Sequence, residues 1–278
     1  MLGQLGEGAK VLAGGQSLIP LLKLRFANPE HLVDLNFIPD TSFIKEDSGT
    51  LHFGAMTRHA EIEHSALARK VPVLHDCAAG IADVQVRNRG TIGGSLAEAD
   101  PSGDWANALI TLQTTVHCLG SDGPRTIHLK DFIKDAYTTA LAHNELVTEV
   151  EVKVPPEGSG GAYVAFKRSG PVYPSASAAV QLTMAGDVCQ DAAVALGCVG
   201  LTAIRATEAE AALRGRSLDY KTIATAAEAA RAAADPQPDM RGSAEYKRQL
   251  VVALVKRAVL IAARRARGEQ VEGAHLYA

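Results

Sequence analysis

The clearest pattern in the chain is an alternation of apolar and polar residues over residues 147–154, which read Val-Thr-Glu-Val-Glu-Val-Lys-Val. A period of two places alternate side chains on opposite faces of a strand, so this segment predicts a half-buried strand. Shorter apolar runs predict further strands at residues 10–13, 31–35, 50–55, 115–119 and 125–128. The last two flank Gly-Ser-Asp-Gly-Pro, a composition typical of a hairpin turn.

Helical patterns lie between these strands. Apolar residues favour helices over residues 58–67, 72–82 and 105–112. A short helix is predicted over residues 18–26, with Ser17 as its cap and Pro20 in its first turn, where the amide hydrogen would be unpaired anyway. Residues 84–86 read Val-Gln-Val, which favours the start of a strand.

A stretch rich in proline and glycine at residues 155–161 predicts a domain boundary. After it, residues 162–167, 176–184 and 192–199 predict three strands of a small antiparallel sheet. From residue 206 the chain is rich in alanine and predicts helices, the last over residues 245–267. The grouping of strands and helices indicates an α+β fold.

The 278 residues carry a formal net charge of −3, with a pI near 6.3. This charge provides no broad positive field for a phosphate backbone, so nucleic-acid binding is not expected. Apolar runs are shorter than the roughly 18 residues that a membrane span needs, and the N-terminus does not resemble a secretion leader. We therefore expect a cytoplasmic protein without a membrane span.

The sequence also argues against a metal centre. The cysteines form no Cys-x-x-Cys pair, so neither a zinc site nor an iron–sulfur cluster is expected; they are Cys77, Cys118, Cys189 and Cys198. Buried thiols are favoured over a catalytic cysteine. His59 and His64 are five residues apart and fall on different helix faces, so they predict a surface helix and no zinc site. The basic residues Arg264, Arg265 and Arg267 are expected at the negative end of the last helix or on the surface.

Two glycine-rich turns carry the strongest chemical signal. Residues 13–17 read Ala-Gly-Gly-Gln-Ser, and residues 91–95 read Thr-Ile-Gly-Gly-Ser. Without side-chain bulk, consecutive backbone N–H groups can face outward and bind anionic oxygens, and two such turns can enclose a pyrophosphate. Ser17, Thr91 and Ser95 would add hydroxyl donors. The plainer alternative is that each glycine pair only permits a positive φ in a tight turn.

These turns resemble the two FAD-binding motifs of the medium, flavin subunit of molybdenum hydroxylases, the carbon monoxide dehydrogenase and xanthine dehydrogenase family. The resemblance covers residues 11–25 and 87–101, and residues 239–248 resemble that family's C-terminal domain. It implies a two-subdomain FAD-binding domain of the vanillyl-alcohol-oxidase type, followed by a C-terminal domain with the three-stranded sheet and helices. The implied domains are an N-terminal FAD subdomain over 1–48, a second FAD subdomain over 49–156 and the C-terminal domain over 161–278.

The resemblance also implies which residues hold FAD. They are Val11, Leu12, Ala13, Gly14, Gly15, Gln16, Ser17 and Leu18 in the first motif, Thr91, Ile92, Gly93, Gly94 and Ser95 in the second, and Ile81, Asp104, Val147 and Lys167 elsewhere. Ile81 and Val147 match apolar contacts, and Asp104 matches an acidic one. Lys167 matches a lysine near the isoalloxazine ring, where a cation favours the reduced, anionic flavin. The alternative for Lys167 is a surface position at the end of a strand.

By this resemblance, the chain is expected to be the FAD-binding electron-transfer subunit of a heteromeric oxidoreductase, with no catalytic acid, base or nucleophile of its own. Its partners would be a molybdenum-cofactor large subunit and a [2Fe-2S] small subunit, in a dimer of heterotrimers. FAD would pass electrons from the iron–sulfur subunit to an external acceptor. The alternatives are a stand-alone flavin oxidase or reductase with its own organic substrate, and a scaffold that has lost FAD.

The N-terminus of the chain differs from the pattern of this family. Members of the family normally have a further strand and helix before the first glycine turn, whereas twelve residues precede Ala13 here. The expectation is a shortened N-terminal subdomain that exposes backbone groups and apolar surface.

Overall fold

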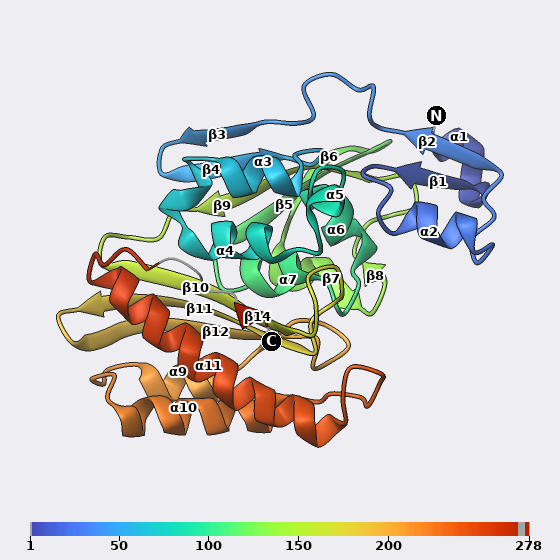
Figure 1. The fold of residues 1–278 in the computed structure, drawn as a ribbon. Helices are drawn as coiled ribbons and strands as arrows, with labels where there is room; N and C mark the ends of the chain where they lie inside the picture. The colour runs from blue at the N-terminus through green and yellow to red at the C-terminus, as the bar shows by residue number, and fades with distance from the viewer. Residues whose placement is uncertain (1, 272–275, 278) are drawn as a thin grey trace.

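The computed structural model describes residues 2–271 and 276–277, which form three units (Figure 1). In the small N-terminal unit, β1 pairs parallel with β2, and the connection between them contains α2. Parallel strands cannot be joined by a tight hairpin, so the chain must cross over between them. The unit comprises α1 (Leu2–Leu5), a 3-10 turn (Gly6–Gly8), β1 (Ala9–Leu12), α2 (Leu18–Lys23) and β2 (His31–Asp34).

The middle unit contains a five-stranded antiparallel sheet, in the order β3-β4-β9-β5-β6 among the described residues. Its strands are β3 (Ile44–Asp47), β4 (Thr50–Gly54), β5 (Thr114–Gly120), β6 (Gly123–His128) and β9 (Leu146–Lys153). The predicted alternation is confirmed in β9, where Val150 and Val152 are fully buried while Glu149 and Glu151 are partly exposed. The predicted hairpin is also confirmed, since β5 pairs with β6 and Gly120 faces Gly123.

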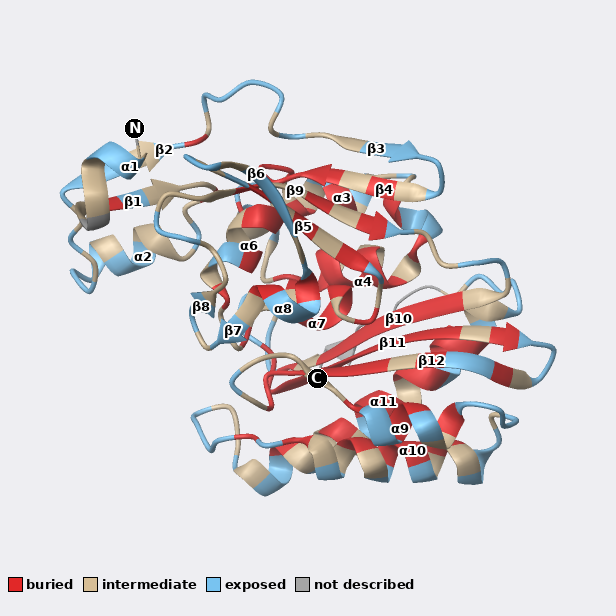
Figure 2. Cartoon of the chain, turned by 180° about the vertical axis from the view of Figure 1, so that it is seen from behind, coloured by how far each residue is buried: buried red, intermediate tan, exposed pale blue. Residues whose placement is uncertain are grey.

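Helices cover the buried face of this sheet (Figures 1 and 2). They are α3 (His59–His64), a 3-10 turn (Ala68–Lys70), α4 (Pro72–Gly80), α5 (Val84–Arg87), α6 (Ile92–Glu98), α7 (Asp104–Leu109) and α8 (Leu129–Phe132). The short strands β7 (Ile133–Asp135) and β8 (Thr138–Thr139) pair beside them. Trp105, Phe53 and Phe132 are fully buried in the core between sheet and helices.

The C-terminal unit corrects the prediction of a three-stranded antiparallel sheet. The three predicted strands are present, but the described residues form a five-stranded sheet in the order β13-β12-β11-β10-β14, and β14 runs parallel to β10. The strands are β10 (Ser159–Lys167), β11 (Ala176–Ala185), β12 (Val188–Gly197), β13 (Ile204–Arg205) and β14 (Leu276–Tyr277). The two additional strands have two residues each, too few for a periodic pattern in the sequence to reveal.

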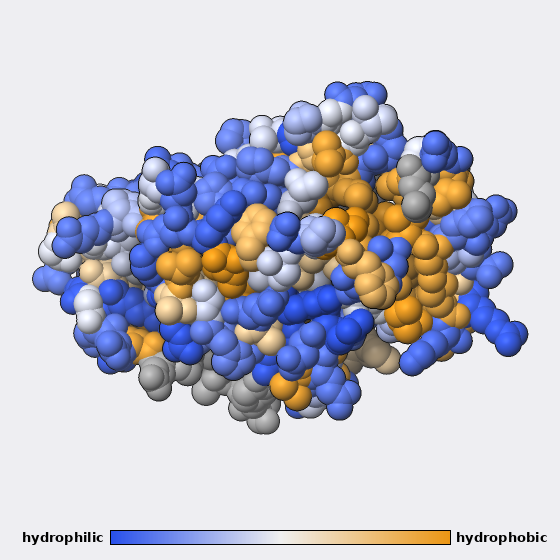
Figure 3. All heavy atoms as spheres, turned by 90° about the horizontal axis from the view of Figure 1, so that it is seen from above, coloured by the Kyte–Doolittle hydropathy of each residue, from blue (hydrophilic) through white to orange (hydrophobic). Residues whose placement is uncertain are grey.

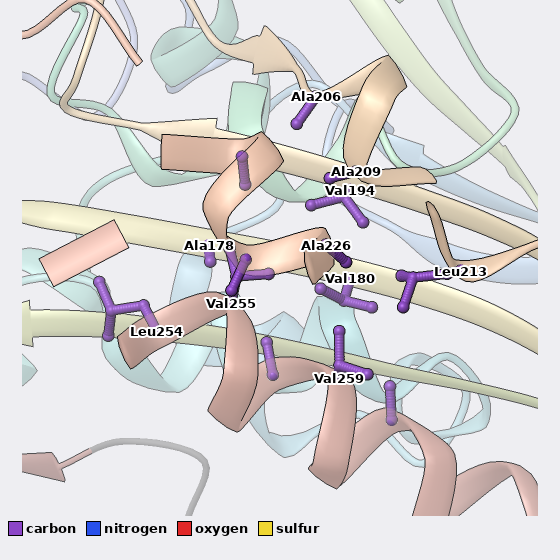
Figure 4. Close-up of a cluster of buried hydrophobic side chains, with 14 of the residues drawn as sticks. Ala178, Val180, Val194, Ala206, Ala209, Leu213, Ala226, Leu254, Val255 and Val259 are labelled. Atoms are coloured by element: carbon purple, nitrogen blue, oxygen red, sulfur yellow. The ribbon is translucent and has the colours of Figure 1, made fainter. Parts of the chain in front are cut away.

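Both faces of this sheet are covered. One face is covered by α9 (Thr207–Leu213), α10 (Tyr220–Ala233) and α11 (Ala244–Ala266), and Figure 4 shows Val180 of the sheet beside Val259 of α11 and Val194 beside Ala209 of α9. Side chains on the other face, including Tyr163 and Ala179, belong to the core of the middle unit. This explains why β11 is buried almost throughout its length instead of at alternate residues.

Local predictions failed at three places. Residues 84–86 lie in helix α5, because the Asp83 carboxylate accepts the Val86 amide at 2.9 Å and caps a helical turn. Ser17 does precede α2, but its hydroxyl accepts no hydrogen bond from the amides of that helix among the described residues. A strand at residues 44–47 was not predicted from the sequence.

Candidate functional site

A cavity of about 590 Å³ opens where the N-terminal unit, the middle unit and the β10–β11 loop meet. This volume lies within the roughly 300–1,000 Å³ that is usual for small-molecule sites. Most of the residues predicted to hold FAD line it: Val11, Ala13, Gly14, Gly15, Gln16, Ser17, Leu18, Ile81, Thr91, Gly94, Ser95, Asp104 and Lys167. The structure therefore brings both glycine turns to one cavity.

Four of the predicted residues lie outside the lining of this cavity. They are Leu12, Ile92, Gly93 and Val147. Ile92 and Val147 are buried in the core of the middle unit, and an added Cβ on Gly93 would lie 2.6 Å from the Cβ of Ala55. In α6, residues 91, 94 and 95 share one helical face, whereas residues 92 and 93 turn toward the sheet.

The second glycine turn does not offer its amides to a ligand. Ile92 N–H donates to the Thr57 carbonyl at 3.1 Å, and Gly93 N–H donates to the Ala55 carbonyl at 2.9 Å. The Gly94 amide donates to the Thr91 hydroxyl at 3.1 Å, and the Ser95 amide donates to the Thr91 carbonyl at 3.0 Å. The expectation of outward-facing amides in this turn is therefore wrong. Thr91, Gly94 and Ser95 of this turn line the cavity, so the donors that it can offer are the hydroxyl groups of Thr91 and Ser95.

The first glycine turn is different. Within the described part of the chain, the amides of residues 14–17 have no hydrogen-bond acceptor. Gly15 has a φ of +73°, a left-handed conformation that favours glycine, and an added Cβ would lie 2.9 Å from Ile19 Cγ1. This turn precedes α2 and lines the cavity, so its free N–H groups can bind anionic oxygens.

The two turns touch each other. A Cβ added to Gly14 would lie 2.3 Å from the Arg89 carbonyl oxygen, and one added to Gly94 would lie 3.4 Å from the Cβ of Ala13. Glycine at position 14 is thus required for close approach of two backbone segments that are distant in sequence.

Strand β10 contributes two buried polar residues at this site. Lys167 is 4% exposed, lines the cavity and donates from Nζ to the carbonyl of Gly80, at the end of α4. The surface alternative for Lys167 is therefore wrong. Four residues earlier, the hydroxyl of buried Tyr163 donates to Asp104 Oδ1 at 2.6 Å. Asp104 lines the cavity as the first residue of α7.

Several cavity residues carried no sequence signal. The β10–β11 loop supplies Val172 and Tyr173, and burial, followed by the neighbouring Asp100 carboxylate, raises the pKa of Tyr173. Burial and then Asp100 also raise the pKa of Glu98, which lines the cavity. Loop residues of this kind follow no period, so only their position in the fold identifies them.

The prediction of a surface helix is wrong for His59. This residue is 5% exposed, and its Nδ1 accepts the indole N–H of Trp105 at 3.0 Å. Burial, and then the charges of Arg58 and Arg87, lower the pKa of His59 to about 3. His59 is thus a neutral core residue at the cavity wall.

The cysteines are all buried and free, as the sequence predicts. Burial raises the pKa of Cys118 and Cys189 to about 11 and that of Cys198 to about 12, and it also raises the pKa of Cys77. Protonated thiols of this kind are not nucleophiles near neutral pH. Across the residues that the structure describes, no group of three or more His, Cys, Asp or Glu side chains could hold a metal ion. No helix formed by these residues is long and apolar enough to span a bilayer.

Comparisons with known proteins agree with this geometry. Residues 1–155 match the model for the FAD binding domain in molybdopterin dehydrogenase, and residues 161–262 match that for the CO dehydrogenase flavoprotein C-terminal domain. The chain is 41% identical over 268 residues to the carbon monoxide dehydrogenase medium chain of Afipia carboxidovorans, covering 96% of this chain and 93% of that one. It is 39% identical over 264 residues to 6-hydroxypseudooxynicotine dehydrogenase complex subunit alpha of Paenarthrobacter nicotinovorans. This match covers 94% of this chain and 89% of that one.

The fold is also similar to that of a solved structure. The structure superposes on carbon monoxide dehydrogenase from Hydrogenophaga pseudoflava with a TM-score of 0.92 and 41% sequence identity, covering 95% of this chain and 92% of that chain.

Proposed function

Because this chain belongs to the family of FAD-binding medium subunits of molybdenum hydroxylases, we propose that its cavity holds FAD and that it acts as the electron-transfer subunit of such an enzyme. Residues 1–48 and 49–156 would form the two FAD subdomains, of the vanillyl-alcohol-oxidase type, and residues 161–278 the C-terminal domain. Bound FAD would supply the redox chemistry by accepting and passing on electrons.

The observation that carries this proposal is the pairing of the two turns across one cavity. The free amides of residues 14–17 would hold the diphosphate, and the hydroxyls of Ser17, Thr91 and Ser95 would donate to phosphate or ribitol oxygens. The close contact of Gly14 with the Arg89 carbonyl leaves no room for a side chain between the turns.

The ring end of FAD would lie toward Ile81, Asp104 and Lys167. Lys167 would place a cation beside the ring, because its buried ammonium is held by the Gly80 carbonyl at a cavity wall. A cation in this position stabilises the anionic, reduced flavin and so raises its reduction potential. Among the remaining predicted contacts, Leu12, Ile92, Gly93 and Val147 would act indirectly, by packing behind the lining residues.

The partners would be a molybdenum-cofactor large subunit and a [2Fe-2S] small subunit, assembled as a dimer of heterotrimers in the cytoplasm. Exposed apolar side chains on the N-terminal unit and the loop after it support such assembly. Phe26 is 78% exposed and Phe37 is 87% exposed, and Leu24 and Leu32 are also exposed. Figure 3 shows hydrophobic residues gathered toward the right, the side on which the N-terminal unit lies in Figure 1. Contiguous exposed apolar surface of this kind usually contacts another protein.

The direct test is binding of FAD to the purified full-length chain. FAD should co-elute as a yellow complex, and at a free concentration of 100 Kd it should raise the free energy of unfolding by about 2.7 kcal/mol. Riboflavin, which lacks the diphosphate, should bind far more weakly. A colourless chain whose unfolding is unchanged by FAD would exclude the proposal.

The electron-transfer role is tested separately. In a reconstituted complex, the substrate of the molybdenum-cofactor large subunit should reduce FAD only when both partner subunits are present. Reduction of FAD by an organic substrate in the isolated chain would favour a stand-alone flavin oxidase or reductase instead.

A further inference from the structure

Arg58 lies at the centre of a side-chain bridge between the two glycine turns. Its Nη2 donates to Asn36 Oδ1 at 2.6 Å, and its Nη1 donates to the Arg89 carbonyl, just before the second turn. Asn36 in turn donates from Nδ2 to the carbonyl of Ala13, the first residue of the first turn, at 2.9 Å. One guanidinium therefore connects both turns, through two acceptors that a planar fork can reach together.

The backbone of Arg58 is fixed to the second turn. Arg58 forms an isolated antiparallel bridge with Thr91, the His59 amide donates to the Gly90 carbonyl at 3.1 Å, and the Ile92 amide donates to the Thr57 carbonyl. The second turn is thus held by main-chain hydrogen bonds whatever the side chain at position 58.

Among the described residues, the main-chain hydrogen bonds of the first turn do not reach the second turn. Ile19 N–H donates to the Gly15 carbonyl, and Leu35 N–H donates to the Leu12 carbonyl, both at 3.0 Å. Strand β1, which leads into it, pairs with β2, and the amides of residues 14–17 have no acceptor in the described chain. The free amides of this turn can bind a ligand only if the turn stays at the cavity wall, where Gly14 packs against the Arg89 carbonyl. Asn36, which accepts from Arg58, donates to the Ala13 carbonyl and so holds the turn next to that contact.

We propose that Arg58, acting through Asn36, is a positioning residue that holds the first glycine turn with its amides toward the cofactor cavity. This rests on the proposed FAD site, and it adds a residue that does not itself line the cavity. The positive charge of Arg58 is not the essential property; its two simultaneous hydrogen bonds are.

The test compares two arginines in the full-length chain. Arg214 in the C-terminal unit also donates to a side chain and to a carbonyl, with Asp191 Oδ1 at 2.9 Å and the Ala192 carbonyl at 2.6 Å. We expect R58M to raise the Kd for FAD roughly tenfold, as for loss of a charge-assisted hydrogen bond. R214M should change it by less than about twofold, although it removes a further hydrogen bond to Glu210 Oε2 at 3.0 Å.

Amide hydrogen exchange of the FAD-free chain separates positioning from general destabilisation. In R58M the amides of Ile19 and Leu35, which donate to the Gly15 and Leu12 carbonyls at 3.0 Å, should exchange faster, whereas those of residues 92–95 should exchange as in the wild type. In R214M neither segment should change. Asn36→Ala, which keeps Arg58 but removes the link, should give the same pattern as R58M and supplies the test should R58M not fold.

Three results would overturn the inference. One is an unchanged Kd in R58M and N36A, and another is equal acceleration of exchange in both turns. The third is full FAD affinity in R58K, which keeps the charge but not the planar fork. Failure of the wild-type chain to bind FAD would instead overturn the proposed function, and the exchange measurement would still report whether Arg58 holds the turn.

Discussion

At the scale of single residues, Gly14 is where the cavity depends most directly on the absence of a side chain. An alanine Cβ would lie 2.3 Å from the Arg89 carbonyl oxygen, a backbone atom that cannot move without separating the two turns. Overpacking of this kind costs roughly 1–3 kcal/mol, so Gly14→Ala should weaken FAD binding about tenfold or more in a fluorescence titration. Gly170→Ala is the control, because an added Cβ there meets no atom within 4 Å. Equal affinities in the two variants would contradict this account.

His59 makes a residue-scale prediction about pH. Its pKa is about 3 in the folded chain, chiefly because it is buried, against an ordinary value of 6.5. The unfolded chain therefore binds more protons between these values, and the free energy of unfolding should fall as the pH falls from 6.5 toward 3. The contribution of His59 between pH 7 and pH 5 is about 2 kcal/mol.

Urea unfolding at pH 7 and pH 5, followed by Trp105 fluorescence, measures this dependence. His59→Asn retains an acceptor for the Trp105 indole but does not titrate, so its stability should fall less between the two pH values. The same pH dependence in both proteins would show that His59 is not the group responsible.

At the scale of elements, α11 is tied to α4 by a buried ion pair. Arg265 Nη1 lies 2.6 Å from Asp76 Oδ2, and the same guanidinium donates to the Gly161 carbonyl at 2.8 Å. Burial raises the pKa of Asp76, but hydrogen bonds from His75 and Arg265 outweigh it and leave the pKa lowered. Of the two alternatives for Arg265, the position at the negative end of the last helix is confirmed, since Arg265 lies in the last turn of α11, and the surface position is wrong.

Removing one partner of this pair leaves a buried charge without compensation. Arg265→Met should lower the free energy of unfolding by about 3–5 kcal/mol. Arg264→Met, one residue earlier, removes an exposed pair with Glu269 and should cost less than about 1 kcal/mol. Denaturant unfolding of both variants measures this difference. An equal loss of unfolding free energy in the two variants would mean that burial of the Arg265 pair does not add to the stability.

At the scale of the whole molecule, the middle and C-terminal units share a core. Tyr163, Ala165, Ala179 and Ala195 of the C-terminal sheet pack with Trp105 and the helices of the middle unit. We therefore expect residues 44–266 to unfold in one transition, although multidomain chains often do not. Fluorescence of Trp105, the single tryptophan in the chain, and far-ultraviolet circular dichroism should give coincident urea curves. Separate midpoints would show that the two units are independent.

Features that depend only on neighbouring residues could be predicted from the sequence. The alternation in β9 predicts one buried face, and paired glycines predict tight turns, because strand period and side-chain bulk are local properties. The resemblance of the two glycine motifs to those of the family was enough to indicate FAD.

Which of these groups can still bind a ligand depends on contacts between distant parts of the chain, and these are seen only in the folded structure. Both glycine turns look alike in sequence, yet the amides of one are bound by carbonyls of Ala55 and Thr57 and those of the other are free. In the same way, His59 is buried against Trp105 and Arg265 against Asp76. Each of these acceptors or neighbours lies far away along the chain, so the pairing arises from packing and has no local signal in the sequence.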